Sequence, residues 1–293
     1  MLQRPLGSSS LTVSALGFGA GHIDVGDMTE REARVLLDGV LELGVTFIDT
    51  ARGYGASEER LGRWMSPHRE AVVLSTKVGY DVPGQEDWTA GAVREGVERA
   101  LRVLQTDRID VMFLHSCPVE VLQTGEVVEA LLACRSAGKV LAAGYSGENV
   151  ALSWAGESGL FDVLQTSVNI ADQHSRRAVL PFARQRGIGV VAKRPLANAA
   201  WRYRERPIGV YGETYWQRLR HMNVQPQADD WVGTAIRFSA FTPGVSTAIV
   251  GTSSLSHLAH AAMAVDRGPL PLEEAHQWED AFRPHEAEWS GEV

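Results

Sequence analysis

Residues 29–49 read Thr-Glu-Arg-Glu-Ala-Arg-Val-Leu-Leu-Asp-Gly-Val-Leu-Glu-Leu-Gly-Val-Thr-Phe-Ile-Asp, and this stretch contains both patterns that decide the fold. Thr29 and Glu32 have the spacing of a capping box, which predicts the start of a helix. Apolar side chains then recur at helical spacing, and Gly44 suits the position just past the helix end. The run 46–49 that follows is short and apolar, as in a strand buried on both faces.

The same alternation of helix and apolar run extends in both directions along the chain. Residues 93–104 again show helical spacing, and a helix capped by Thr124 is expected to end at Gly138. The eight apolar runs are 15–19, 46–49, 72–76, 109–114, 140–144, 163–166, 188–192 and 247–250. This alternation predicts a single α/β domain over residues 1–293, a (β/α)8 TIM barrel with an extra C-terminal helix.

The alternation is interrupted once, over residues 198–227, which follow the seventh strand and have no clean period. In a barrel this long loop lies at the carboxyl rim, where such loops usually form lids or binding loops. A surface excursion that covers a helix is the alternative. Its large side chains would border a pocket or form a core of their own: Trp201, Tyr203, Tyr211, Tyr215, Trp216 and Met222.

The composition excludes several classes of protein. The chain has 293 residues, with 28 Lys and Arg against 36 Asp and Glu, a formal net charge of −8. No basic run offsets this charge, so nucleic acid is not expected as a partner. The two cysteines, Cys117 and Cys134, form no CxxC motif, which argues against a disulfide framework or structural zinc. Without a signal-like or membrane-spanning apolar segment, we expect a soluble, cytoplasmic protein with no membrane partner.

Reactive side chains follow three of the predicted strands. Asp49, Lys77 and His115 come at strand ends, and Tyr54 lies in the loop after Asp49. The carboxyl ends of barrel strands meet at one rim, so these four side chains should converge there. Each of them alone has a structural interpretation, as a cap, an ion pair or a core histidine. Their coincidence favours a site.

These four residues suit acid catalysis at a carbonyl group. A tyrosine hydroxyl titrates near ~10 in water, and a neighbouring ammonium lowers that value. Lys77 can act on Tyr54 in this way while Asp49 holds Lys77 charged. His115 can donate a hydrogen bond to a substrate oxygen. The set includes neither an activated nucleophile nor a group of metal ligands, and His257 and His260 have no third ligand nearby, so no metal site is expected.

Three motifs carry a resemblance to a known family. The stretch Gly44-Val-Thr-Phe-Ile-Asp49-Thr-Ala-Arg-Gly-Tyr54-Gly-Ala-Ser-Glu58-Glu-Arg-Leu-Gly62 resembles the first signature of the aldo-keto reductases. The second signature is similar to Leu101-Arg-Val-Leu-Gln-Thr-Asp-Arg-Ile-Asp110-Val-Met-Phe-Leu-His115, and Leu74-Ser-Thr-Lys77-Val resembles the family's lysine strand. The resemblance implies that Tyr54 is the general acid, that Lys77 and Asp49 tune it, and that His115 orients the carbonyl.

The resemblance also implies a nicotinamide cofactor, NADP(H) by family default, with NAD(H) as the alternative. No GxGxxG motif opens a helix here, so a Rossmann site is not expected. The family binds the adenosine phosphate with the segment after the last strand, where a helix N-terminus favours a phosphate. Helix capping by Ser254 or Ser256 is the alternative reading. The residues implied at this end are Gly251, Thr252, Ser253 and His257, where a Lys and an Arg are frequent at the first and last positions.

At the nicotinamide end, Ser146 and Gln165 resemble the residues that bond the carboxamide. Gly147 stands where the family often has Asn. After the seventh strand, where many members place a stacking aromatic, this chain has Lys193, Arg194, Pro195 and Leu196. The Lys193 stem or the Arg194 guanidinium could lie on the nicotinamide ring, or either could grip the pyrophosphate.

The remaining rim loops supply the candidate substrate pocket, namely His22, Tyr80, Trp88 and Trp201. An aromatic rim suits a flat apolar or sugar-like carbonyl compound. We therefore expect an NAD(P)H-dependent oxidoreductase that reduces an aldehyde or ketone to an alcohol, or catalyses the reverse. Two alternatives are a nicotinamide-nucleotide-binding sensor with little turnover and a Schiff-base lyase that uses Lys77 as its nucleophile.

Overall fold

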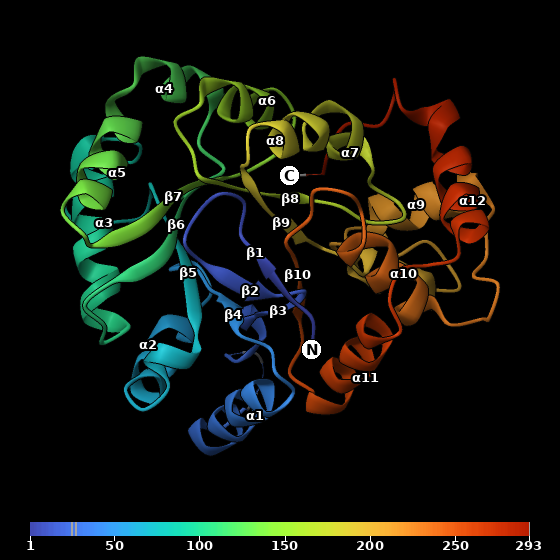
Figure 1. Ribbon diagram of the computed structural model, residues 1–293, viewed down its shortest axis with the longest axis horizontal. Coiled ribbons are helices and arrows are strands. Elements are labelled where there is room, and N and C mark those ends of the chain that lie inside the picture. The colour runs from blue at the N-terminus through green and yellow to red at the C-terminus, as the bar shows by residue number, and fades with distance from the viewer. Residues whose placement is uncertain (25, 27, 293) are drawn as a thin grey trace.

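A computed structural model describes residues 1–24, 26 and 28–292. Its centre is a closed barrel of parallel strands, which confirms the predicted fold (Figure 1). Each barrel strand overlaps one of the eight predicted runs. The strands are β3 (Leu16–Gly19), β4 (Phe47–Asp49), β5 (Val73–Val78), β6 (Ile109–His115), β7 (Val140–Ser146), β8 (Val163–Ser167), β9 (Gly189–Lys193) and β10 (Thr247–Gly251).

Helices surround the barrel as an outer layer (Figure 1). They are α1 (Glu30–Glu42), α2 (Ser57–Met65), α3 (Ala90–Val103), α4 (Val119–Thr124), α5 (Glu126–Ser136), α6 (Asn149–Ser158), α7 (His174–Ala178), α8 (Leu180–Gln185), α9 (Glu213–Met222), α10 (Trp231–Ala240), α11 (Leu255–Asp266) and α12 (Leu272–Phe282), with 3-10 turns η1 (Ala20–His22), η2 (Arg69–Ala71), η3 (Ala197–Arg202) and η4 (Arg283–His285). The Thr29–Glu32 capping box is present at α1. Thr124, in contrast, ends α4, and Gly125 occupies the cap of α5, so the predicted cap was wrong.

A short hairpin that the sequence analysis did not identify covers the amino end of the barrel. It pairs β1 (Gln3–Pro5) with β2 (Thr12–Ser14). Leu6 and Val13 are fully buried and pack with Phe47, Val111 and other side chains inside the barrel. The hairpin therefore closes the amino end with apolar contacts, and the carboxyl end remains for a site.

The irregular segment 198–227 contains a helix. Tyr215, Leu219 and Met222 of α9 have helical spacing and are buried. They pack in a second core with Trp278 and Phe282 of the C-terminal helix α12. The predicted extra helix α12 is confirmed, whereas part of the predicted loop is the helix α9, which the buried Tyr215, Leu219 and Met222 anchor by tertiary packing.

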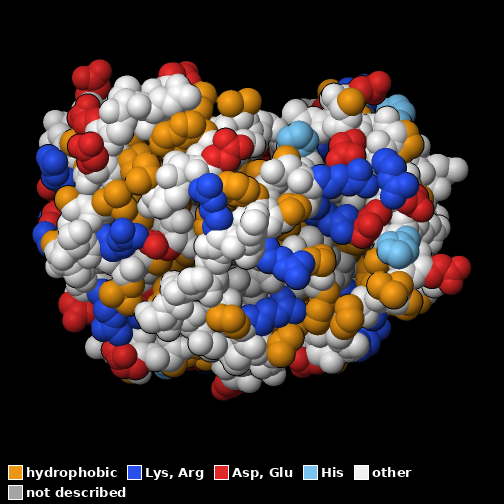
Figure 2. All heavy atoms as spheres, turned by 45° about the horizontal axis from the view of Figure 1, so that its top comes forward, with side chains coloured by type: hydrophobic (Ala, Val, Ile, Leu, Met, Phe, Trp, Pro, Cys, Tyr) orange, Lys and Arg blue, Asp and Glu red, His pale blue; other side chains and the backbone are white. Residues whose placement is uncertain are grey.

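The surface mixes charges of both signs. Figure 2 shows basic and acidic side chains interspersed over one face, with hydrophobic side chains in small groups between them. Ion pairs such as Arg176–Glu279 at 2.6 Å and Arg177–Glu286 at 2.7 Å neutralise part of this charge locally. Every helix in the described part of the chain is too short or too polar to cross a lipid bilayer.

Candidate active site

The strand ends bring the four predicted side chains to one rim of the barrel. Asp49 is the last residue of β4, Lys77 lies near the end of β5, and His115 is the last residue of β6. Neighbouring strands are parallel and in register, with Asp49 opposite Ser75 and His115 opposite Ser146. Because of this pairing, the side chains at and just after these strand ends lie at the same end of the barrel.

Lys77 and Asp49 form a buried ion pair. The Lys77 Nζ lies 2.7 Å from Asp49 Oδ2 and also donates to the Thr50 carbonyl oxygen at 2.7 Å. Only 4% of Lys77 and 2% of Asp49 is exposed. Burial opposes the charge on Lys77, but Asp49 and then Tyr54 outweigh that penalty, so the pKa of Lys77 is raised. Lys77 is therefore held as an ammonium ion.

Tyr54 lies beside this ammonium. The Lys77 Nζ is 5.0 Å from the centroid of the Tyr54 ring. The Tyr54 and His115 rings meet edge to face at 6.3 Å between centroids. A Cβ atom at Gly21 would lie 3.3 Å from the Tyr54 ring, so glycine there leaves room for the phenol. The phenol thus lies close to both a fixed cation and an imidazole.

His115 is neutral in this setting. Burial, followed by the charges of Lys77 and Lys193, lowers the pKa of His115 to about 3. Its Nδ1 lies 2.8 Å from the hydroxyl of Tyr80. The imidazole also borders a cavity at the carboxyl rim, so its other nitrogen can meet a ligand there.

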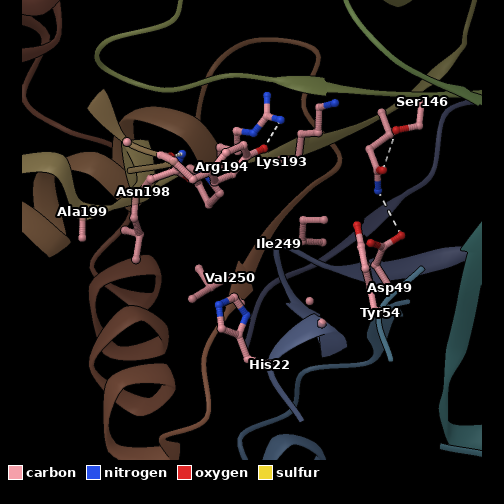
Figure 3. A pocket seen from close by; sticks show the side chains of 18 of the residues that line it. His22, Asp49, Tyr54, Ser146, Lys193, Arg194, Asn198, Ala199, Ile249 and Val250 are labelled. Atoms are coloured by element: carbon pink, nitrogen blue, oxygen red, sulfur yellow. Dashed lines mark hydrogen bonds between the residues drawn. The ribbon is translucent and has the colours of Figure 1, made fainter. Parts of the chain in front are cut away.

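A cavity of about 740 Å³ extends from these residues along the carboxyl rim. In Figure 3, Asp49 and Tyr54 lie at one end, Asn198 and Ala199 at the other, and Ile249 and Val250 between them. An elongated cavity of this volume suits a ligand of several linked groups. The residues predicted from sequence that line it are His22, Asp49, Tyr54, Lys77, His115, Ser146, Gln165, Lys193, Arg194, Pro195, Leu196 and Gly251.

Three predicted pocket residues lie elsewhere. In the part of the chain that the structure describes, Tyr80, Trp88 and Trp201 do not line the cavity. Tyr80 stacks on His115 at 5.4 Å, and Trp88 packs against Tyr80 at 5.6 Å. Trp201 stacks on Trp231 of α10 at 5.3 Å. These aromatic rings support other side chains.

Ser146 and Gln165 form a polar chain that leads to the ion pair. Ser146 Oγ donates to Gln165 Oε1 at 2.8 Å, and Gln165 Nε2 donates to Asp49 Oδ1 at 3.0 Å. Ser75 Oγ also donates to Asp49 Oδ1, at 2.7 Å. Both candidate carboxamide ligands are therefore oriented by the same carboxylate that holds Lys77 (Figure 3).

Lys193 and Arg194 are both engaged by protein groups. The Lys193 Nζ lies 3.2 Å from Oε1 of the buried Glu148, and burial lowers the pKa of Lys193 despite this pairing. Arg194 donates to Ser167 Oγ at 3.0 Å and to the carbonyl oxygen of Glu292. Its guanidinium also lies 5.1 Å from the centroid of the Tyr211 ring. A ligand would meet these cations with their charges partly satisfied.

The candidate phosphate segment has an ordinary helix cap. Ser254 is the N-cap of α11 and accepts from the His257 backbone N–H at 3.5 Å. Among the described residues, Thr252, Ser253 and His257 do not line the main cavity, which reaches Gly251. Ser253 borders a separate hollow of about 230 Å³ together with Arg31 of α1.

Other lining residues were not identified as site residues from the sequence. Ser116 directly follows the strand end at His115, which is a signal that could have located it. Most of the others come from the segment after β9, which includes Tyr203 and Tyr211, two of the aromatic residues expected at the rim, and four come from β3, η1 and β10. These additional residues are Gly19, Gly21, Ser116, Asn198, Ala199, Arg202, Tyr203, Val210, Tyr211, Gly212, Ile249 and Val250.

Known proteins resemble this chain over nearly its full length. The model of the Aldo/keto reductase family matches residues 15–283. The chain is 26% identical to the uncharacterized oxidoreductase YqkF of Bacillus subtilis (strain 168), over 97% of this chain and 99% of that protein. It is 28% identical to the NADH-specific methylglyoxal reductase of Escherichia coli (strain K12), over 91% of each. The holo form of aldo-keto reductase AKR11C1 from Bacillus halodurans superposes with a TM-score of 0.83 and 28% identity over 96% of each chain.

Proposed function

This chain belongs to the aldo/keto reductase family, and on that premise we propose that it reduces an aldehyde or ketone to an alcohol, or catalyses the reverse, with NADP(H) or NAD(H). The observation that carries the proposal is the position of Tyr54, whose ring centroid lies 5.0 Å from the Lys77 ammonium. A phenolic hydroxyl beside a fixed cation and a neutral imidazole suits proton donation to a carbonyl oxygen.

In this proposal each residue of the rim has one task. Tyr54 donates the proton to the carbonyl oxygen, and Lys77 stabilises the negative charge left on the phenol oxygen. Asp49 keeps Lys77 protonated and aimed. His115 donates a hydrogen bond that orients the same carbonyl oxygen. A reduced nicotinamide, when bound, supplies the hydride that these side chains lack.

The elongated cavity and its polar groups support the binding of a nicotinamide dinucleotide. Ser146 and Gln165 are buried hydrogen-bonding side chains beside Asp49, where a carboxamide could bind. Pro195, Leu196 and Gly251 line the rest of its length. Gly251 and His257 offer no strong cation for a 2′-phosphate, and the Escherichia coli relative is NADH-specific by name. Both nucleotides therefore belong in the test.

The test is the Tyr54→Phe variant, which removes only the phenolic hydroxyl. We expect turnover of an aldehyde panel to fall by at least about 100-fold, because general acid catalysis contributes roughly that much. The Kd for the nucleotide should stay close to that of the wild type. Turnover is followed by NADPH or NADH absorbance and Kd by nucleotide fluorescence.

Tyr145→Phe is the matched control, because the buried Tyr145 hydroxyl donates to the Cys117 carbonyl oxygen at 3.0 Å, and Tyr145 is not among the described residues that line the cavity. This variant should turn over substrate at nearly the wild-type rate. A Tyr54→Phe protein that kept the wild-type rate would overturn the assignment of the general acid.

Borohydride trapping and the turnover measurements separate two rival functions. A Schiff-base lyase needs a neutral Lys77, whereas the ion pair with Asp49 holds Lys77 charged despite its burial. Borohydride trapping of a carbonyl compound on Lys77 would support that rival. A nucleotide-binding sensor would bind NADPH or NADH tightly and leave every carbonyl compound of the panel unreduced.

A further inference from the structure

We infer that Tyr80 is a positioning residue for His115, an inference that rests on the proposed function. The Tyr80 hydroxyl lies 2.8 Å from His115 Nδ1, and the two rings stack with centroids 5.4 Å apart. In this assignment the Tyr80 hydroxyl donates a hydrogen bond to His115 Nδ1. The imidazole N–H is then on Nε2, the nitrogen that a ligand in the cavity can meet.

The charges around this pair keep the Tyr80 phenol protonated and His115 neutral. Burial raises the pKa of Tyr80, so the phenol keeps its proton and has one to donate. His115 is buried near two lysine ammonium groups, Lys77 and Lys193, which disfavour a second proton on the ring. A neutral imidazole has one N–H and one bare nitrogen. When the phenol donates to Nδ1, the remaining N–H must be on Nε2.

The alternative tautomer would not serve carbonyl reduction. If Nδ1 carried the proton and donated to the Tyr80 oxygen, the bare Nε2 would face the carbonyl oxygen of a substrate. Two acceptors would then oppose each other, and the carbonyl would lose a hydrogen bond that orients it. Tyr80 thus determines whether His115 can act as a donor.

The loop after β5 holds Tyr80 in place. Gly79 has φ +134°, and a Cβ atom there would lie 2.1 Å from the Trp88 ring. The Trp88 backbone N–H donates to the Gly79 carbonyl oxygen at 2.7 Å, and the Trp88 ring packs on Tyr80 at 5.6 Å. Tyr80 therefore contacts both the Trp88 ring and His115. Only glycine at residue 79 allows this close return of the loop.

The direct test is ¹⁵N NMR of histidine-labelled protein without nucleotide or substrate, in the wild type and in Tyr80→Phe. The wild type should show His115 protonated on Nε2, with an Nδ1 resonance shifted as expected for a hydrogen-bond acceptor. Tyr80→Phe keeps the stacked ring but removes the donor. Its Nδ1 resonance should move towards that of an unbonded nitrogen, and the Nδ1–H tautomer should become more populated.

Trp88→Phe is the control, because it alters the packing of Tyr80 and keeps its hydroxyl. This variant should keep the wild-type tautomer and Nδ1 shift. In kinetics, Tyr80→Phe should lower kcat/KM for an aldehyde by about threefold to tenfold, the effect of losing one neutral hydrogen bond, with the nucleotide Kd unchanged.

Two results would overturn the inference: a wild-type His115 protonated on Nδ1, or an Nδ1 resonance that is the same in Tyr80→Phe as in the wild type. Neither result depends on turnover. Failure of the proposed function, seen as full activity in Tyr54→Phe, is therefore distinguishable from failure of this inference.

Discussion

The Asp49–Lys77 pair illustrates how function and stability compete at single residues. Removing two charges from water costs free energy that their attraction regains only with good geometry. Here Asp49 accepts from Lys77, Ser75 and Gln165 at 2.7, 2.7 and 3.0 Å, so its oxygens are well satisfied. An apolar pair of the same volume could fold as well, but it would offer Tyr54 no cation. The pair is best explained by the chemistry it supports.

Asp49→Asn should therefore destabilise the fold, because the Lys77 ammonium would be left buried without a counter-charge. We expect a loss of about 3–5 kcal/mol in the free energy of unfolding, measured by urea denaturation. The double variant Asp49→Asn/Lys77→Met removes both charges and should recover much of this loss. If the urea midpoint of Asp49→Asn equals that of the wild type, the Asp49 charge does not stabilise the buried Lys77 ammonium as proposed.

Among single residues, the sequence predicted the reactive side chains but not the residues that pack behind them and position them. Asp49, Lys77 and His115 could be placed together because parallel strands end at one rim. Tyr80 was expected to border the substrate, whereas it packs behind His115. Its position depends on the backbone conformation at Gly79, which the spacing of residues along the chain does not predict.

Among the elements, the segment after β9 is the most strained. Arg194, Ala197, Asn198 and Ala199 have φ between +44° and +54°, a region that residues other than glycine rarely adopt. All but Ala197 line the cavity, and Ala197 is fully buried beside them. This strain is concentrated at the rim, next to the cations that a ligand would meet. It also explains why no regular period was visible in the sequence there.

A second junction of elements centres on Asp172, in the loop between β8 and α7. Its Oδ2 accepts from the Tyr215 hydroxyl of α9 and from the Glu292 backbone N–H, both at 3.0 Å. The chain end is thus tied to α9 and to the loop after β8. Burial, followed by the charge of Glu148, raises the pKa of Asp172 to about 6.

This raised pKa predicts a pH effect on stability. The folded protein holds the Asp172 proton up to about pH 6, whereas an unfolded aspartate releases it near ~4. The contribution of Asp172 is therefore fully present below pH ~4 and is lost as the pH rises through about 6, on the order of 3 kcal/mol in all. Asp172→Asn keeps an oxygen acceptor and removes this titration. Its unfolding free energy should rise relative to the wild type between pH 4 and 7, and parallel curves would contradict the assignment.

In the whole molecule, the barrel topology was the most predictable feature, because each barrel strand coincides with a short apolar run in the sequence. The β1–β2 hairpin was not predicted, since its three-residue strands include polar residues and Pro5. The cavity was only partly predictable. Its floor comes from strand ends, which periodicity locates, but its far wall comes from η3 and the loop to α9, whose conformation depends on tertiary contacts.

Closure of the barrel is what makes the proposed chemistry coherent. Residues 49 and 54, residue 77 and residue 115 lie in three separate stretches of the sequence, yet successive parallel pairings of β4, β5 and β6 bring them to one rim. The central claim is that the phenol and the ammonium at this rim act as a unit on a carbonyl oxygen. Groups that act as a unit show strongly non-additive effects when they are removed together.

The most direct measurement is a double-mutant cycle on kcat/KM with Tyr54→Phe, Lys77→Met and the double variant, using an aldehyde substrate and saturating NADPH or NADH. We predict that each single variant loses at least about 100-fold and that the double variant is no slower than the slower single variant. A double variant that lost the product of the two single losses would show that the residues act independently. That result would contradict the account.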